Sequence, residues 1–312
     1  MHYRLLVTPL NQAAFFNESL KISISEVEIL TGIRPTVHEI GSMQFLDLDF
    51  EGAPHELSRL ATIAGIFECH DDRLVPLDIK PDFSLSRNLV YGAKYPGKTN
   101  ESLTQLALNL AIHFADSEPS TPHYLLDPMA GRGTTLLWAA RYGISADGIE
   151  ADGKALVDFQ REVKKFTKLD RLKHKEEGGQ LPHLKKATDS RFSSFAFAET
   201  KARLIHGDSR ELSKYVGHKK RYSLIVSDLP YGVQHFAGKD RSPLATLQAA
   251  APQWAKALRA GGSMVLAFNA FLPKRPELVE IFAAEGLKPQ EPAFAHRVSE
   301  SIKRELAIFT KA

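Results

Sequence analysis

The sequence predicts a doubly wound α/β fold, in which a mostly parallel sheet is preceded by a small α/β domain. Three observations support this prediction. After residue 124, short apolar segments alternate with longer segments that have the apolar spacing of helices. The apolar segment Ser223–Ser227 shows no polar–apolar alternation, which is typical of a central parallel strand. Residues 1–85 differ in charge from the remainder of the chain, which indicates a separate domain.

The N-terminal domain is expected to contain both strands and helices. Tyr3–Pro9 is predicted to form a first strand and Asn17–Leu30 a helix. Phe45–Phe50 alternates apolar and acidic residues, which is typical of a half-buried strand, and Leu57–Phe67 is predicted to form a second helix. A linker-like stretch with two prolines follows, and we place the domain boundary between residues 85 and 86.

The second domain, residues 86–312, is expected to begin with a helix that Thr99 or Asn100 caps. Strands and helices then alternate up to the C-terminus. The strands are expected at Tyr124–Leu126, Ala146–Ile149, Leu204–His206, Ser223–Ser227, Met264–Phe268 and Glu305–Phe309. The helices are expected at Thr134–Tyr142, around Leu156–Phe166, at Leu247–Arg259 and at Pro276–Glu285.

The charge of the chain is divided unevenly between the two domains. The 312 residues carry a net charge of +3, but residues 1–85 hold six basic and 13 acidic side chains, which leaves +10 for the second domain. A basic domain fits a polyanionic partner, since neutralised phosphates drive sequence-independent binding of nucleic acids. Moderately basic surfaces are also common in enzymes with other substrates.

The composition excludes several other classes of protein. No apolar run approaches the roughly 18 residues that a membrane span needs. The single cysteine, Cys69, can form neither an internal disulfide nor a thiolate zinc site, and the histidines show no metal-binding spacing. We therefore expect a soluble, cytoplasmic protein that contains no metal.

A basic insertion is predicted at about residues 161–191, because 53 residues separate Glu150 from Leu204 and a helical crossover usually needs fewer. The stretch contains ten Lys or Arg and five Asp or Glu. It is either a solvated helix face followed by a loop or a basic arm that contacts phosphates. The candidate phosphate-binding residues are Lys164, Lys165, Lys168, Arg171, Lys173 and Lys175.

A glycine-containing turn at residues 127–135 provides the first candidate site. Gly131 and Gly133 allow the backbone to turn tightly and approach a ligand. Position 136 is Leu, so the dinucleotide pattern of three glycines is incomplete, and no Lys-Ser/Thr pair follows as in a phosphate-binding loop. Asp127 precedes the glycines at the end of a predicted strand, where a carboxylate repels a pyrophosphate and attracts an ammonium group.

S-adenosylmethionine (SAM) has an ammonium group, a sulfonium group and no phosphate. Its ribose needs an acceptor after the next strand, where Glu150 stands, and its adenine amine needs one after the third strand, where Asp208 stands. The predicted cofactor is therefore SAM, because ligands of doubly wound sheets lie outside the carboxyl ends of the strands.

A second candidate site follows the strand at residues 223–227. An exocyclic base amine is a poor nucleophile, so a site that methylates it must accept the hydrogens of the amine and orient it. Asp228 and the carbonyl of Leu229 are candidate acceptors, Pro230 fixes the turn, and the ring of Tyr231 is a candidate stacking surface for the base. These residues also suit an ordinary turn, since Asp, Pro and Gly favour turns.

These motifs resemble those of the class I amino-methyltransferases, which have a Rossmann-like sheet with an antiparallel last strand. Residues 127–134 (DPMAGRGT) resemble their motif I, and residues 228–232 (DLPYG) resemble motif IV of the THUMP-linked tRNA guanosine-N2 methyltransferases. Residues 95–103 resemble the segment before motif I that contacts the methionine part of SAM, and residues 296–304 resemble the final hairpin. The resemblance covers about residues 87–312, and its two motifs are specific for methylation of an amine. It implies cofactor-binding roles for Thr99, Asp127, Met129, Gly131, Gly133, Thr134, Glu150, Asp208 and Ser209, and catalytic roles for Asp228, Leu229, Pro230 and Tyr231.

The resemblance implies an RNA substrate, most simply tRNA methylated at guanosine N2. Three alternatives stay open: a DNA adenine-N6 or cytosine-N4 methyltransferase, a protein-glutamine methyltransferase, and a SAM-binding scaffold without catalysis. The acidic N-terminal domain is short for a THUMP module, although Leu57–Phe67 is faintly similar to the end of one. It either positions RNA by shape, contacts another protein or forms a dimer.

Overall fold

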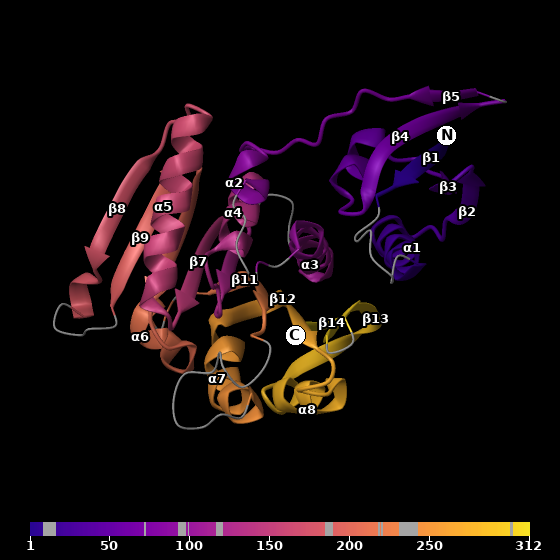
Figure 1. The fold of residues 1–312 in the computed structure, drawn as a ribbon. Helices are drawn as coiled ribbons and strands as arrows, with labels where there is room; N and C mark the ends of the chain where they lie inside the picture. The colour runs from indigo at the N-terminus through magenta and orange to yellow at the C-terminus, as the bar shows by residue number, and fades with distance from the viewer. Residues whose placement is uncertain are drawn as a thin grey trace. The chain divides into compact units, whose positions relative to one another are not determined.

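The computed structural model describes residues 1–8, 17–71, 73–92, 98, 100–116, 121–184, 190–217, 219, 221–230, 243–299 and 302–312. The chain divides into two compact units (Figure 1). The first unit comprises Met1–Asp82 and Pro292–Glu305, and the second comprises Phe83–Glu291 and Leu306–Ala312. Within the described ranges, no helix combines the length and the apolar character that a membrane span requires.

The first unit contains a five-stranded antiparallel sheet with the strand order β2-β3-β1-β4-β5. The strands are β1 (His2–Val7), β2 (Thr36–Ile40), β3 (Met43–Asp49), β4 (Ile63–His70) and β5 (Arg73–Pro76). Helix α1 (Asn17–Thr31) packs on this sheet through Val27, which lies in one apolar core with Leu5, Leu46 and Ile66. The buried Glu26 of the same helix accepts hydrogen bonds from the Ala61 amide and the Thr62 hydroxyl, at 2.8 and 3.0 Å.

The predicted helix at Leu57–Phe67 is wrong. A 3-10 helix, η1, covers only Pro54–Arg59, and Ile63–His70 forms strand β4, which lies between β1 and β5 in the small sheet. Strand β4 pairs with β1, with Leu5 opposite Ile66. This long-range pairing, together with the low helix propensity of Gly65, outweighs the local apolar spacing that favoured a helix.

The second unit is built on a nine-stranded sheet with the order β13-β14-β12-β11-β6-β7-β10-β9-β8. The five central strands β12, β11, β6, β7 and β10 are parallel. Their bounds are β6 (Tyr124–Asp127), β7 (Ser145–Glu150), β10 (Thr200–His206), β11 (Tyr222–Asp228) and β12 (Leu258–Asn269), and the last two strands are β13 (Leu287–Ser299) and β14 (Ile302–Lys311). The predicted doubly wound, mostly parallel fold is confirmed.

Helices cover both faces of this sheet (Figure 1). Helices α3 (Glu101–Phe114), α4 (Thr134–Arg141) and α5 (Gly153–Leu169) lie on one face, and α7 (Pro243–Ala257) and α8 (Arg275–Ala284) lie on the other. Trp254 of α7 and Leu278 of α8 pack with Ile225 and Leu266 of the sheet. Two short helices, α2 (Asn88–Tyr91) and α6 (Leu212–Val216), complete the unit.

The predicted basic insertion extends the sheet with two strands. Strands β8 (Lys175–Gln180) and β9 (Arg191–Phe197), with the 3-10 helix η2 (Pro182–Leu184) between them, add antiparallel strands beyond β10. Phe195 of β9 is buried against Phe159 of α5, with the ring centroids 5.8 Å apart. Strand β8 is exposed along its whole length and ends the sheet. The described part of this segment is therefore ordered structure and not the loop that was one of the two predictions.

The strand order changes direction between β6 and β11. From β6 the sheet continues through β7 and β10 on one side and through β11 and β12 on the other. In doubly wound sheets such a switch point leaves a crevice at the carboxyl ends of the two strands, where ligands bind. Asp127 ends β6 and Asp228 ends β11, so both predicted motifs lie at this switch point.

Candidate active site

The glycine turn between β6 and α4 lies directly on strand β7. Gly131 and Gly133 have φ angles of +50° and +78°, which residues other than glycine rarely adopt. The Ala130 amide donates to the carbonyl of Ile149 at 2.9 Å. A Cβ atom on Gly148 would lie 2.7 Å from the Cβ of Ala130, so this close approach requires a glycine on β7. Among the described residues, no neighbouring atom lies within 4 Å of the Cβ position of Gly131.

Asp127 is buried at the start of this turn, with 1% of its surface exposed. One carboxylate oxygen, Oδ1, accepts hydrogen bonds from the Ser227 hydroxyl at 2.7 Å and from the Met129 amide at 3.2 Å. Burial raises the pKa of the Asp127 carboxyl to about 7, although hydrogen bonds from Ser227, Thr135 and Met129 oppose this shift. The charge of Asp228 raises this pKa further. Among the described residues, Asp127 forms no ion pair.

Glu150 connects the glycine turn to the loop after β7. Its Oε2 accepts from the Gly131 amide at 2.8 Å, and its Oε1 accepts from the Asp152 amide at 2.8 Å. These two bonds fix the orientation of the carboxylate at the end of the strand. Each carboxylate oxygen has two acceptor positions, so Glu150 can still accept hydrogen bonds from a ligand.

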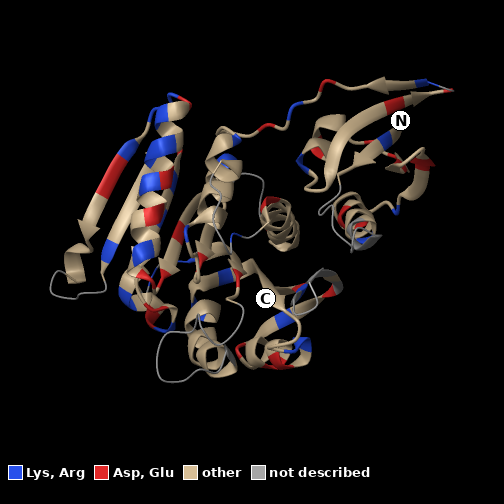
Figure 2. Cartoon of the chain, viewed as in Figure 1, with Lys and Arg blue, Asp and Glu red and all other residues tan. Residues whose placement is uncertain are grey.

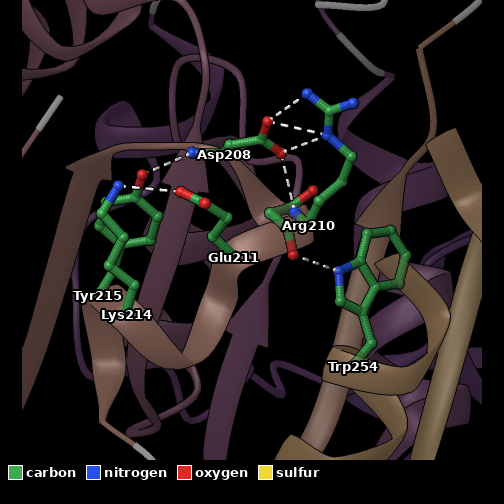
Figure 3. A network of polar contacts seen from close by, with 7 residues as sticks. Asp208, Arg210, Glu211, Lys214, Tyr215 and Trp254 are labelled. Atoms are coloured by element: carbon green, nitrogen blue, oxygen red, sulfur yellow. Dashed lines mark hydrogen bonds and ion pairs between the residues drawn. The ribbon is translucent and has the colours of Figure 1, made fainter. Parts of the chain in front are cut away.

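Asp208 and Ser209 follow β10 at the same edge of the sheet, and Figure 3 shows the polar contacts of Asp208. The Asp208 carboxylate is paired with Arg210, with its Oδ2 at 2.5 Å from a terminal guanidinium nitrogen. Asp208 also caps the 3-10 helix η3 (Ser209–Glu211) by accepting from the Arg210 amide at 2.9 Å. Ser209 is buried, and its carbonyl accepts from the indole of Trp254 at 3.3 Å.

The second motif begins where β11 ends. Asp228 is half-buried, and its neighbour Ala267 on β12 accepts a hydrogen bond from the Leu229 amide at 2.8 Å. The Leu229 side chain is part of the apolar core, so only its backbone carbonyl is available for the predicted role. Pro230 is half-buried after it. Tyr231 and Thr99 lie outside the described residues.

The remaining cofactor candidates lie on or beside the glycine turn. Met129 is half-buried against the apolar core, and Thr134 opens helix α4 directly after Gly133. In the segment before motif I, Asn100 caps α3 by accepting from the Ser102 and Leu103 amides, at 2.8 and 3.3 Å. The structure thus brings the described cofactor and amine candidates to one edge of the sheet.

The predicted phosphate-binding residues lie towards the opposite edge. Lys175 is in register with Ala196 of β9, which in turn pairs with Lys201 at the amino end of β10. Helix α5 starts at the carboxyl edge and runs back, so Lys164, Lys165 and Lys168 near its end also lie towards the amino edge. Figure 2 shows Lys and Arg, in blue, along the length of this helix. Lys164 forms an ion pair with Glu176 at 2.9 Å, and the Lys165 ammonium lies 4.9 Å from the ring centre of Phe166. Arg171 and Lys173 are exposed in the turn before β8.

Two further features of the carboxyl edge, where the candidate site lies, were not predicted from the sequence. Ser227 links the two motifs through its bond to Asp127, and a serine inside a strand carries no signal for that role. Phe271 and Leu272 follow β12 at the same edge and are 51% and 45% exposed. Their exposure depends on the turn that they form, which no apolar pattern in the sequence indicates.

Comparisons with known proteins show what this architecture is similar to. No protein-family model and no curated protein matches the chain. Among solved structures, TrmN from Thermus thermophilus is 13% identical, with a TM-score of 0.54 over 100% of both chains. A TehB-like SAM-dependent methyltransferase from Corynebacterium glutamicum is 20% identical over 61% of this chain and 80% of its own, with a TM-score of 0.38. An rRNA methylase from Streptococcus thermophilus is 12% identical over 66% of this chain and 95% of its own, with a TM-score of 0.41. From its sheet order and its full-length likeness to TrmN, the chain has the class I fold of the SAM-dependent methyltransferases.

Proposed function

We propose that this protein is a SAM-dependent methyltransferase that acts on an exocyclic base amine in RNA, with guanosine N2 of tRNA as the preferred target. The observation that carries this proposal is the contact between the two motifs. The Ser227 hydroxyl bonds to Asp127 at 2.7 Å, and Ser227 directly precedes Asp228. The residue proposed to accept the amine is thereby adjacent to the turn proposed to hold the cofactor.

The chemistry of the turn suits a cationic nucleoside without phosphates. Asp127 is a buried carboxylate that forms no ion pair with a described residue, so an ammonium or sulfonium group would offset its charge. Glu150 holds a fixed carboxylate where ribose hydroxyls would donate, and Asp208 follows the next strand, where the adenine amine would lie. No described residue fills the position beside Gly131, where the methionine part would lie. The residues present therefore fit SAM.

The chain's own residues would perform the transfer through orientation and electrostatics. SAM, when bound, supplies an electrophilic methyl group on its sulfonium. Asp228 accepts a hydrogen bond from one N–H of the target amine, and the Leu229 carbonyl accepts one from the other N–H. These two bonds direct the nitrogen lone pair towards the methyl group. The amine nitrogen gains positive charge as the new N–C bond forms, so the carboxylate of Asp228 stabilises the transition state more than the bound substrate. The new N–C bond would replace the bond between the methyl group and sulfur, with S-adenosylhomocysteine as the other product, and the Asp228 carboxylate would take the surplus proton of the methylated amine.

RNA as substrate is supported by the basic second domain and by the motif IV form DLPYG. A target base inside folded RNA must leave its stack, and an aromatic side chain after Pro230 is suited to receive it. The resemblance to the tRNA guanosine-N2 enzymes and the likeness of fold to TrmN both favour guanosine in tRNA over other amines.

The test is to incubate the protein with methyl-labelled SAM and bulk tRNA, rRNA or DNA, and to identify the labelled nucleoside by mass spectrometry. We expect label in N2-methylguanosine from tRNA. Label in N6-methyladenine or N4-methylcytosine from DNA would replace this proposal with the DNA alternative. SAM binding without transfer to any of the three nucleic acids, or to protein glutamine, would identify a non-catalytic scaffold.

A further inference from the structure

The Asp208 carboxylate is fully engaged by Arg210 (Figure 3). Its Oδ1 accepts from the Arg210 amide at 2.9 Å and from the guanidinium Nε at 3.0 Å. Its Oδ2 accepts from Nε at 2.9 Å and from a terminal nitrogen at 2.5 Å. A carboxylate has about four acceptor positions, so these contacts occupy the group that the proposed function assigns to the adenine amine.

The backbone around Asp208 is held in place by two buried aromatic side chains. The Asp208 amide donates to the Tyr215 hydroxyl at 3.3 Å, and the Ser209 carbonyl accepts from Trp254 at 3.3 Å. A Cβ atom on Gly207 would lie 2.5 Å from the Tyr215 ring, so the strand end and the ring are in close contact. A ligand that needs an oxygen of Asp208 is therefore accommodated by movement of the Arg210 side chain and not of the backbone.

The Arg210 side chain is suited to such a movement. It is 34% exposed and Asp208 is 29% exposed, and ion pairs in partly exposed positions contribute little net free energy. The bond from the Arg210 amide to Oδ1 is made by the backbone, so it can persist when the guanidinium leaves. Departure of the guanidinium removes the two hydrogen bonds that it donates to Oδ2, which gives an adenine amine an acceptor in their place.

We infer that Arg210 changes its partner when SAM binds. It pairs with Asp208 in the absence of SAM and binds an RNA phosphate when SAM occupies the nucleoside site. The inference rests on the proposed function, because it takes Asp208 as the acceptor for adenine. Arg210 follows β10 at the carboxyl edge, the same edge at which Asp228 would meet the target base. A guanidinium fork matches the oxygens of a phosphate group, so RNA is the natural second partner for the released charge.

The exchange couples the two substrates. Since SAM binding would free a cation for RNA, RNA binding must strengthen SAM binding by the same factor. A structural role for Arg210, limited to stabilising the turn at Asp208, predicts no such coupling. The two roles therefore differ in a measurable property other than stability or activity.

The first measurement is calorimetric titration with S-adenosylhomocysteine, the demethylated product, in the absence of RNA. Arg210→Ala should bind it about two- to fivefold more tightly than the wild type, because the ligand no longer displaces an ion pair of that strength. Lys214→Ala is the matched control, because it removes a neighbouring ion pair, the one between Lys214 and Glu211 at 2.9 Å. The affinity of Lys214→Ala for S-adenosylhomocysteine should equal that of the wild type.

The second measurement is the salt dependence of tRNA binding with and without S-adenosylhomocysteine. In the wild type the log–log slope should steepen by about 0.7–0.9 when the ligand is present, which corresponds to one added phosphate contact. In Arg210→Ala the two slopes should be equal. Equal ligand affinity in Arg210→Ala and the wild type, or a wild-type slope that the ligand does not change, would overturn the inference. Absence of ligand binding to the wild type itself would overturn the proposed function, and the inference with it.

Discussion

Two buried aspartates on adjacent strands of the large sheet differ in whether a cationic side chain pairs with them. Asp147 of β7 is completely buried and is paired inside the protein, with Arg203 Nε at 2.7 Å and the Tyr222 hydroxyl at 2.7 Å. Asp127 of β6 is almost as buried, but its described partners are hydroxyl and amide groups that carry no charge. The register of the two strands separates these residues by one position, since Asp147 is opposite Leu126.

The comparison separates a buried carboxylate that stabilises the fold from one that is available to a ligand. A buried carboxylate is costly unless a cation offsets it, and Arg203 does so for Asp147. For Asp127 the cost remains, and the pKa of its carboxyl is raised to about 7. A charge that the protein leaves without a cation is available for a cationic ligand. The predictions below test this distinction between internally paired charges and charges kept for a ligand.

The largest effect is expected from the paired aspartate. Arg203→Ala removes the guanidinium that pairs with the buried carboxylate of Asp147, which should lower the free energy of unfolding by about 3–5 kcal/mol. Urea denaturation measures this loss. Lys201→Ala is the matched control on the same strand, because it removes an exposed ion pair with Glu177 at 2.9 Å. The control should cost about 0–1 kcal/mol, and an equally small loss for Arg203→Ala would contradict a structural role for the Asp147 pair.

The next effect concerns Asp228, which we expect to act on the substrate and not on folding. Asp228→Ala should lower single-turnover methylation by about two to three orders of magnitude, because the carboxylate stabilises charge that develops in the transition state. Asp228→Asn should lose less, since its amide oxygen still accepts a hydrogen bond. SAM affinity and the urea midpoint should stay close to those of the wild type. Wild-type turnover in Asp228→Ala would place the target amine elsewhere.

A smaller effect is expected from pH, through Asp127. The raised pKa of about 7 means that the free protein holds this proton up to neutral pH. A cationic ligand favours the ionised form, so SAM affinity should increase from pH 6 to pH 8, by up to about tenfold, and then level off. Calorimetry across this range checks the slope. In Asp127→Asn the slope should disappear together with part of the affinity, whereas a slope that persists would come from another group.

The raised pKa of Asp127 also makes the free energy of unfolding depend on pH. Between pH 4 and 7 the native protein binds this proton more strongly than the unfolded chain, whose aspartates have ordinary pKa values near 3.8. The contribution of Asp127 to the free energy of unfolding is therefore complete below pH 4 and is lost as the pH rises through 7. Asp127→Asn should remove that decline, so the variant gains stability relative to the wild type at pH 8 and not at pH 4.

The parallel sheet could be predicted from the sequence because its strands and helices are local patterns. The amphipathic helix with Leu156, Phe159 and Val163 is an example, since all three side chains are buried. Strand β4 was predicted wrongly because its pairing with β1 is a long-range interaction. Strands β8 and β9 were not predicted either: Lys175–Gln180 contains two adjacent glycines and is exposed throughout, so only its pairing with β9 makes it a strand.

The site shows the same division between local and long-range information. The carboxylates Asp127, Glu150, Asp208 and Asp228 could be located from sequence because each ends or follows a strand, and parallel strands end at one edge. Their partners could not. Whether a carboxylate is paired depends on side-chain conformations, as with Arg210 at Asp208 and Ser227 at Asp127. The sequence therefore indicates where the charges lie and not which of them are already neutralised.

The smallest effects per residue are expected in the basic segment. Its residues, too, are either paired within the protein or left for a ligand. Lys164 is paired with Glu176, whereas Lys168, Arg171, Lys173 and Lys175 form no ion pair with a described residue. If RNA reaches the amino edge of the extension, each lost phosphate contact should reduce the log–log salt slope of tRNA binding by about 0.7–0.9. Replacing the four unpaired residues by Gln should therefore weaken binding and flatten the slope, while Lys164→Gln alone should change it little. SAM affinity should not change, because these residues lie away from the carboxyl edge. A slope that is unchanged in the fourfold variant would make the segment a solvated extension of the sheet, and the phosphate contacts would then have to come from the carboxyl edge itself.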